Sequence, residues 1–190
     1  MDFVGFPKIA RLSRECVVTE KIDGTNAQVH ITPDLDAAIP AVRVVGGLAV
    51  LAGSRTRWIT PSDDNFGFAA WVADHAEELV KLGPGSHFGE WWGSGIQRKY
   101  GLDHKRFSLF NTSRWSDDAA RPACCHVVPV LYQGTFGTDA VRICLSDLLV
   151  NGSRAAPGFM QPEGVIVYHT AGNLYFKKTI LKDEEPKGTR

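Results

Sequence analysis

Short strand-like runs, each ended by glycine or other turn-forming residues, constrain the fold of this chain more than any other feature of its sequence. We predict strands over residues 16–21, 26–31, 42–51 (interrupted at Gly46-Gly47), 88–92, 107–110, 127–132, 164–168 and 174–180. Many neighbouring runs are joined by short turns, which favours antiparallel pairing. The sequence therefore predicts an α+β fold of mostly antiparallel sheets flanked by helices.

Two amphipathic helices separate these strands. The first is predicted to start at a cap on Ser62 or Asp63 and to close at Lys81 and Gly83, with an apolar stripe made of Phe68, Trp71, Val72, His75, Ala76 and Leu79. The second spans residues 138–151 and stops at Gly152, with inward side chains at Val141, Cys144, Leu145, Leu148 and Leu149.

Length and composition bound the class of protein. The chain has 190 residues, which predicts one domain over residues 1–190, with a polar tail at 182–190 that we expect to be flexible. No apolar run approaches the roughly 18 residues that a membrane span needs, and no signal-peptide pattern is present. The four cysteines lack disulfide or zinc-site spacing, which favours a reducing, cytoplasmic compartment.

Charge is balanced overall but uneven along the chain. The formal net charge is zero, which excludes a protein that attracts nucleic acid through its overall charge. A basic cluster surrounds Tyr100 and consists of Arg98, Lys99, His104, Lys105 and Arg106. Taken alone, such a cluster is typical of a solvated surface.

Polar residues stand at the ends of several predicted strands, where packing alone does not require them. They are Lys21, Asp23, Arg55, Arg57, Glu90, Glu163, Lys177 and Lys178. Carboxylates are preferred ligands of Mg²⁺, and lysine and arginine neutralise phosphate. If these strands share a sheet, the pattern predicts a site that handles phosphates together with a metal ion.

The order of these segments resembles that of the covalent nucleotidyltransferases, the superfamily of ATP-dependent RNA ligases, DNA ligases and mRNA capping enzymes. Residues 20–24 (EKIDG) resemble the motif that carries the nucleophilic lysine, and Thr25-Asn26 after it is similar to the RNA ligase branch. Five later segments resemble the remaining motifs of the superfamily, in the same order. They are 54–57 (SRTR), 88–91 (FGEW), 107–111 (FSLFN), 162–167 (PEGVIV) and 175–178 (YFKK). The resemblance covers residues 15–180 and implies a nucleotidyltransferase (ligase adenylation) domain. Many relatives carry a further C-terminal OB domain, and we expect none here because only ten residues follow Ile180.

The resemblance also implies roles for individual residues. Lys21 would attack the α-phosphorus of ATP to form a lysyl-AMP, with Lys177 stabilising the transferring phosphoryl group. Phe110 would stack on adenine, with Phe107 as the alternative. The implied nucleotide-binding residues are Glu20, Ile22, Asp23, Asn26, Arg55, Glu90, Phe110, Lys177 and Lys178, and the implied ligands of Mg²⁺ or Mn²⁺ are Glu163 and Glu90.

Two residues depart from the family pattern. The last motif usually separates its two lysines by one residue, whereas Lys177 and Lys178 are adjacent here. Neighbouring residues of a regular strand point to opposite faces, so only Lys177 is carried over as the catalytic lysine. Asn111 stands where the RNA ligases usually have aspartate, so no role is carried over for it.

The implied function is an ATP-dependent RNA ligase that transfers AMP to a 5′-phosphate and seals it to a 3′-hydroxyl, as in RNA repair. Only twenty residues precede Lys21, too few for the module that binds NAD, so ATP is favoured over NAD. Two alternatives stay open: an ATP-dependent DNA ligase, and a non-catalytic nucleotide-binding protein on the same fold.

The expected partners are ATP and nucleic acid with 5′-phosphate and 3′-hydroxyl ends. Without an OB domain, contacts to the phosphate backbone would come from Arg98, Lys99, Lys105 and Arg106. We expect a monomer, with a helper protein as one route to firmer substrate binding.

Overall fold

The computed structural model describes residues 1–36, 40–181 and 183, which form two compact units. The terminal unit comprises residues 1–21 and 129–190, and the central unit comprises residues 22–128. The chain leaves the terminal unit directly after Lys21 and returns to it at Pro129. Residues 37–39, and all of the predicted flexible tail except Asp183, lie outside the described residues. The single-domain assignment stays a prediction.

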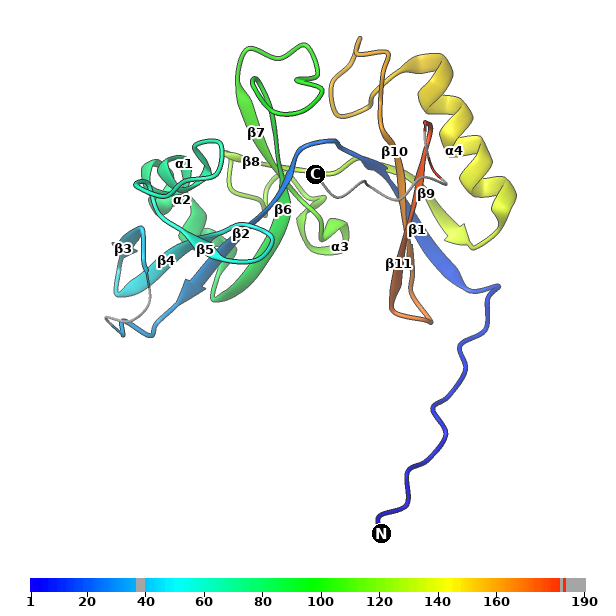
Figure 1. Ribbon diagram of the computed structural model, residues 1–190, viewed down its shortest axis with the longest axis horizontal. Coiled ribbons are helices and arrows are strands. Elements are labelled where there is room, and N and C mark those ends of the chain that lie inside the picture. The colour runs from blue at the N-terminus through cyan, green and yellow to red at the C-terminus, as the bar shows by residue number, and fades with distance from the viewer. Residues whose placement is uncertain (37–39, 182, 184–190) are drawn as a thin grey trace. The chain divides into compact units, whose positions relative to one another are not determined.

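The terminal unit is built on a four-stranded antiparallel sheet in the order β11-β10-β1-β9 (Figure 1). Its strands are β1 (Glu15–Lys21), β9 (Val130–Thr135), β10 (Gly164–His169) and β11 (Leu174–Thr179). The β10–β11 hairpin is formed by the last two predicted strands, 164–168 and 174–180. In β1, Cys16, Val18 and Glu20 are buried and alternate with half-buried residues, as expected for a strand with one covered face.

One helix packs against this sheet. The helix α4 (Thr138–Asn151) has the predicted bounds and ends at Gly152, whose φ of 77° is in the left-handed region that glycine tolerates. Its buried residues Cys144 and Leu148 pack in a cluster with residues of β1 and β10. Leu149 is 56% exposed, so the prediction that it faces inward is wrong. Adjacent residues of a helix differ by about 100° in direction, which turns Leu149 away from the sheet that Leu148 contacts.

The central unit contains a seven-stranded sheet, in the order β3-β4-β2-β6-β7-β8 with β5 paired to β4. Only the β7–β8 pairing is parallel among the described strand pairs. The strands are β2 (Thr25–Thr32), β3 (Arg43–Val45), β4 (Leu48–Gly53), β5 (Trp58–Ile59), β6 (Gly85–Gly93), β7 (Lys105–Leu109) and β8 (Cys125–Val127). The mixed fold with antiparallel-rich sheets is confirmed.

Two pairs of strands that follow one another closely in the sequence, β1–β2 and β8–β9, belong to different sheets. The strands β1 and β2 belong to different sheets, so the Asp23-Gly24 segment between them is not a hairpin turn. The single strand predicted over 127–132 is wrong, because it divides into the end of β8 and the start of β9, again in different sheets. Pro129 lies at this division and has no N–H to donate to a ladder.

The first predicted helix is shorter and broken into α1 (Phe68–Asp74), α2 (Ala76–Leu79) and the 3₁₀ turn η1 (Val80–Leu82). Its predicted N-terminal cap at Ser62 or Asp63 is wrong, whereas its predicted end at Gly83 is confirmed. Asp63 is paired with Arg57, whereas the Asp64 carboxylate accepts hydrogen bonds from the backbone N–H groups of Ala69 (2.8 Å) and Ala70 (3.0 Å). A third helix, α3 (Thr112–Trp115), was not predicted. In the part of the chain that the structure describes, no helix has the length and apolar character needed to span a membrane.

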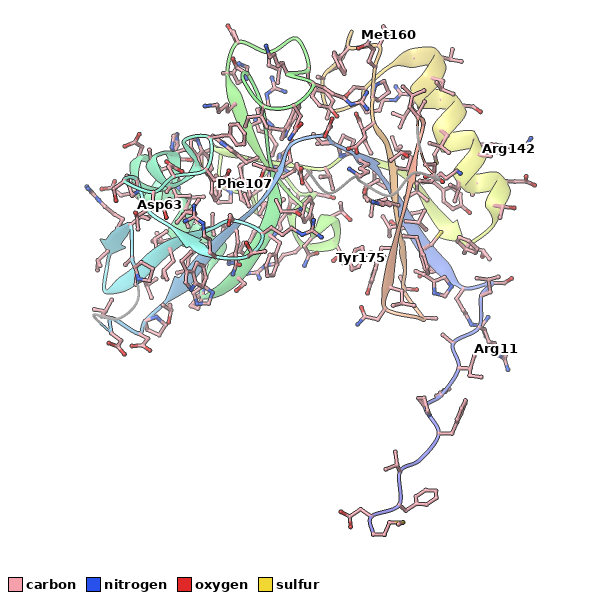
Figure 2. All side chains as sticks on the ribbon, viewed as in Figure 1. Arg11, Asp63, Phe107, Arg142, Met160 and Tyr175 are labelled. Atoms are coloured by element: carbon pink, nitrogen blue, oxygen red, sulfur yellow. The ribbon has the colours of Figure 1, made fainter. Side chains whose placement is uncertain are left out.

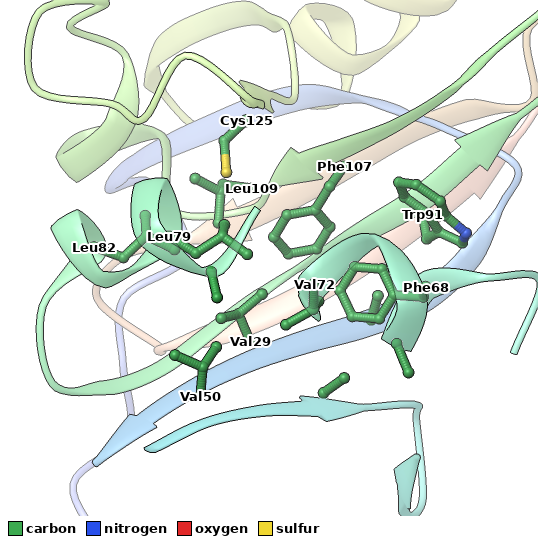
Figure 3. Close-up of a cluster of buried hydrophobic side chains, with 14 of the residues drawn as sticks. Val29, Val50, Phe68, Val72, Leu79, Leu82, Trp91, Phe107, Leu109 and Cys125 are labelled. Carbon is green, nitrogen blue, oxygen red and sulfur yellow. The ribbon is translucent and has the colours of Figure 1, made fainter. Parts of the chain in front are cut away.

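The core of the central unit lies between these short helices and the sheet (Figure 3). The predicted stripe is confirmed, with Phe68, Val72 and Leu79 at most 1% exposed. They share a cluster with sheet residues that include Val29, Val50, Trp91, Phe107 and Leu109. This core packs against β2 and β6, the strands that carry Asn26 and Glu90.

The orientation of α4 is tested by two adjacent leucines. Leu148→Ala empties a fully buried position and should lower the free energy of unfolding by about 2–5 kcal/mol. Leu149→Ala removes an exposed side chain and should change it by no more than about 0.5 kcal/mol. Urea denaturation of both variants checks this, and equal effects would contradict the orientation.

Candidate active site

Lys21 is the last residue of β1 and lies opposite Gly164 of β10. Its Nζ donates to Oε2 of Glu163, the residue directly before β10, and the two side chains form an ion pair. The Lys21 side chain is 16% exposed and that of Glu163 is 7% exposed. Lys21 is therefore an amine held at the end of a sheet against a buried carboxylate, not a solvated surface lysine.

The sheet register gives Lys177 the same face as Lys21. Residues directly opposite each other on antiparallel strands share a face. Lys177 lies opposite Ile166, and Ile166 lies opposite Thr19. Thr19 is two residues before Lys21, which is the spacing of side chains on one face of a strand. Lys177 and Lys21 therefore belong to one side of the sheet.

Lys178 belongs to the other side. It lies opposite Val165, which lies opposite Glu20. The Lys178 Nζ donates to Oδ2 of Asp183 at 2.6 Å. The adjacent lysines of this motif are thus separated by the strand, with only Lys177 on the face of Lys21.

Glu20 is buried on the face opposite Lys21, where it holds a loop. Its Oε1 accepts from the Ser153 hydroxyl at 2.6 Å, and its Oε2 accepts from the backbone N–H groups of Arg154 (2.7 Å) and Ala155 (2.9 Å). Burial raises the pKa of the Glu20 carboxyl above its ordinary value, and the hydrogen bonds from residues 153–155 oppose that shift. The sequence indicated a nucleotide contact for Glu20 and carried no signal for these partners.

In the central unit, a loop after β6 holds Asp23. The Arg98 Nε donates to Oδ2 of Asp23 at 2.9 Å, and the backbone N–H of Asp23 donates to the Tyr100 hydroxyl at 2.7 Å. Tyr100 is 2% exposed. Its φ of 52° lies in the left-handed region, which is unusual for a residue other than glycine. The loop therefore restrains the segment that follows Lys21, a role for Tyr100 that the sequence did not reveal.

The predicted basic cluster is divided by these contacts. Arg98 pairs with Asp23, and Arg106 contacts both the Trp92 ring, at 5.7 Å from its centroid, and His104. Lys99 and Lys105 are exposed. Arg98 and Arg106 are engaged within the unit, so Lys99 and Lys105 are the more accessible of the predicted phosphate contacts.

Glu90 bridges the start of β2. Its Oε1 accepts from the backbone N–H of Gly24 at 3.0 Å, and its Oε2 accepts from the Asn26 side-chain amide at 3.4 Å. A Cβ on Gly24 would lie 2.4 Å from the Trp91 carbonyl oxygen. Gly24 is therefore required by close packing against β6.

A hollow of about 220 Å³ opens beside this group, lined by Asn26, Ala27, Gln28, Ser54, Arg55, Phe88 and Phe110. Phe110 is 39% exposed and Phe88 is 56% exposed. An aromatic ring, a guanidinium and side-chain amides in one hollow suit a nucleotide, with its base against a ring and its phosphate near arginine. Phe88 was not singled out from the sequence.

Two predicted residues have little surface to offer a ligand. Phe107 is fully buried, and its ring lies 5.1 Å from the Phe68 ring, centroid to centroid, within the core. This excludes Phe107 as the stacking alternative to Phe110. Ile22 is 4% exposed.

Glu163 and Glu90, each taken by itself, suit a metal ion that also binds phosphate, rather than a site made of protein ligands alone. Among the described residues, no group of three or more histidine, cysteine, aspartate or glutamate side chains could hold a metal. Mg²⁺ commonly takes one or two carboxylates together with waters and substrate phosphates. Glu163 in the terminal unit and Glu90 in the central unit each offer one buried carboxylate.

Comparison with known proteins identifies the family. The model of the family described as RNA ligase matches residues 14–182. This chain belongs to the RNA ligase family. The resemblance inferred from the order of the motifs is thereby confirmed. No curated protein sequence matches the chain significantly.

Solved structures of Naegleria gruberi RNA ligase share the fold of this RNA ligase family member. A variant with AMP and manganese is 18% identical with a TM-score of 0.61, and the enzyme with pyrophosphate is 19% identical with a TM-score of 0.58. Another variant, with ATP and manganese, is 18% identical with a TM-score of 0.57. Each comparison covers 88% of this chain and 50% of the other, so this chain spans about half the length of these relatives.

The different positions of the two phenylalanines give a direct test. Phe107→Ala should lower the free energy of unfolding by about 3–5 kcal/mol, because it leaves a cavity in the core. Phe110→Ala should cost less than about 1 kcal/mol, because that ring is partly in solvent. Chemical denaturation measures both, and a large loss for Phe110→Ala would mean that Phe110 is a core residue instead.

Proposed function

We propose that this chain is an ATP-dependent RNA ligase that carries AMP on Lys21, transfers it to a 5′-phosphate and seals that phosphate to a 3′-hydroxyl. The observation that carries the proposal is the Lys21 amine, held against buried Glu163 at the end of a sheet whose same face carries Lys177. Membership of the RNA ligase family supports the reaction class.

The first step would join Lys21 to AMP. The Nζ attacks the α-phosphorus, a new N–P bond forms, and the bond to pyrophosphate breaks. Only an unprotonated amine can attack, so the Lys21–Glu163 pair has to give up its proton before the bond forms. Lys177 would stabilise charge on the phosphoryl oxygens as the bonds exchange.

Residues of the central unit would bind the rest of ATP. Phe110 offers a partly exposed ring for adenine, and Arg55 offers a guanidinium for phosphate, both at the lining of one hollow. Glu90, held by Gly24 and Asn26, would accept a hydrogen bond from the ribose. A bound Mg²⁺ or Mn²⁺ would neutralise phosphate charge, with Glu163 and Glu90 as its proposed ligands. The Naegleria gruberi structures with ATP or AMP and manganese support this requirement.

The later steps would act on nucleic acid. An oxygen of the 5′-phosphate attacks the lysyl-AMP and releases the Lys21 amine. A 3′-hydroxyl then attacks the activated 5′-phosphorus, and AMP leaves. Exposed Lys99 and Lys105 are the proposed contacts to the phosphate backbone.

The experiment that tests the proposal is covalent labelling with ATP radioactive at the α-phosphate, in the presence of Mg²⁺ or Mn²⁺. Wild type should retain label after denaturation, and Lys21→Ala should retain none. Lys177→Ala should label at least about 100-fold more slowly, because it removes a charge at the reacting phosphate. Lys178→Ala is the matched control and should label like wild type, since this neighbour lies on the opposite face.

An equal loss of labelling rate in Lys177→Ala and Lys178→Ala would contradict the faces assigned to these two residues. Absence of label from both ATP and GTP, with protein first stripped of any bound AMP, would leave a nucleotide-binding protein without the reaction. Nicked RNA, DNA and hybrid duplexes then separate RNA ligase from DNA ligase. Faster sealing of a DNA 3′-hydroxyl than of an RNA 3′-hydroxyl would favour DNA ligase.

A further inference from the structure

A stacked pair of tyrosines lies on the β10–β11 hairpin of the terminal unit. The rings of Tyr168 and Tyr175 are 4.6 Å apart between centroids, with 27° between their planes. The Tyr168 hydroxyl donates to the Asn173 side chain at 3.0 Å, which anchors the lower ring of the stack to the turn. Tyr175 is 68% exposed and caps the pair at the edge strand β11, where Figure 2 labels it.

The pair shares a face of the sheet with the catalytic lysines. Tyr175 lies opposite Tyr168 and two residues before Lys177, so the register gives all three the face of Lys21. Two residues along an antiparallel strand span about 6.8 Å. On this face, one cross-strand row carries the tyrosine pair, the next row carries Lys177, and the row after that carries Lys21.

Core packing does not account for this pair. The apolar cluster of the terminal unit contains Val18, Val165 and Val167 from the other face of the sheet, together with Cys144 and Leu148 of α4. The tyrosine pair is not part of that cluster. A ring that serves the core would be covered, whereas more than half of Tyr175 is in contact with solvent.

Single-stranded nucleic acids are held by this combination of groups. Cationic side chains track the phosphates, and exposed aromatic rings stack on the bases. Tyrosine suits such a platform because its ring offers a large face with few rotatable bonds. The neighbouring lysines make a phosphate strand, rather than an apolar peptide, the complementary ligand.

We infer that Tyr175, supported from below by Tyr168, is a stacking platform for a base at the 5′-phosphate end of the RNA strand to be joined. The inference rests on the proposed function and adds to it a binding site for the substrate. Lys177 fixes the phosphate end of the strand, and the platform holds a neighbouring base. Because every base has a stacking face, the site is tolerant of sequence.

The test is binding of a single-stranded RNA with a 5′-phosphate and a 3′ fluorophore, followed by anisotropy at fixed salt. Tyr175→Ala should weaken binding by about tenfold or more, the loss of one base stack. Tyr175→Phe keeps the ring and should bind like wild type. Leu174→Ala is the matched control, since Leu174 is the preceding residue of β11, is 55% exposed and lies on the other face. Circular dichroism confirms that each variant is folded.

A second measurement uses the wild-type protein alone. An RNA with 5-iodouridine as its first nucleotide is irradiated in the complex, and the crosslinked peptide is sequenced by mass spectrometry. A crosslink at Tyr175 supports the platform, and a crosslink only at other residues overturns it. Unchanged affinity of Tyr175→Ala also overturns it, as does the absence of RNA binding by wild type.

The two proposals fail separately. If wild type labels with AMP but Tyr175→Ala binds RNA normally, the platform is wrong and the ligase reaction stands. If wild type does not label, the ligase reaction is wrong, and the crosslink still decides whether Tyr175 contacts RNA.

Discussion

The ion pair between Lys21 and Glu163 is the interaction on which the arrangement of the terminal unit's candidate site depends. Two opposite charges are largely removed from water, and each would be costly to bury alone. The pair forms because β1 and β10 are in a register that sets Lys21 opposite Gly164, directly beside Glu163. A shift of one residue would send Lys21 to the face that packs against α4. The backbone pairing of the sheet therefore decides where the amine lies.

In both units, alternation along the strands places residues that pack in the core on one face and residues available to a ligand on the other. In β1, Val18 and Glu20 serve the packed face, where Glu20 holds residues 153–155, while Lys21 belongs to the opposite face. In the central unit, Val29 and Ile31 enter the core, while Asn26 and Gln28 line the hollow. The same division applies to Phe107 in the core and Phe110 at the hollow. The family motifs thus combine residues that build the fold with residues available to a ligand.

Sequence reasoning succeeds where the signal is local. The bounds of α4 follow from its apolar period and Gly152, and the β10–β11 hairpin follows from two strand-like runs around the turn residues Gly172-Asn173. It fails where a partner distant in sequence decides the outcome. Arg98 reaches Asp23 across 75 residues, for example. The partners of Glu20 are likewise distant, which no local period can reveal.

The central claim is that Lys21 carries the nucleotide, and the most direct test is to locate the adduct. Wild-type protein is incubated with ATP and Mg²⁺, denatured, digested and analysed by peptide mass spectrometry with fragmentation. The account predicts AMP on the side chain of Lys21 and its release when pyrophosphate is added before denaturation. AMP attached to Lys177 or Lys178 instead, or a folded protein that never acquires an adduct, would contradict it.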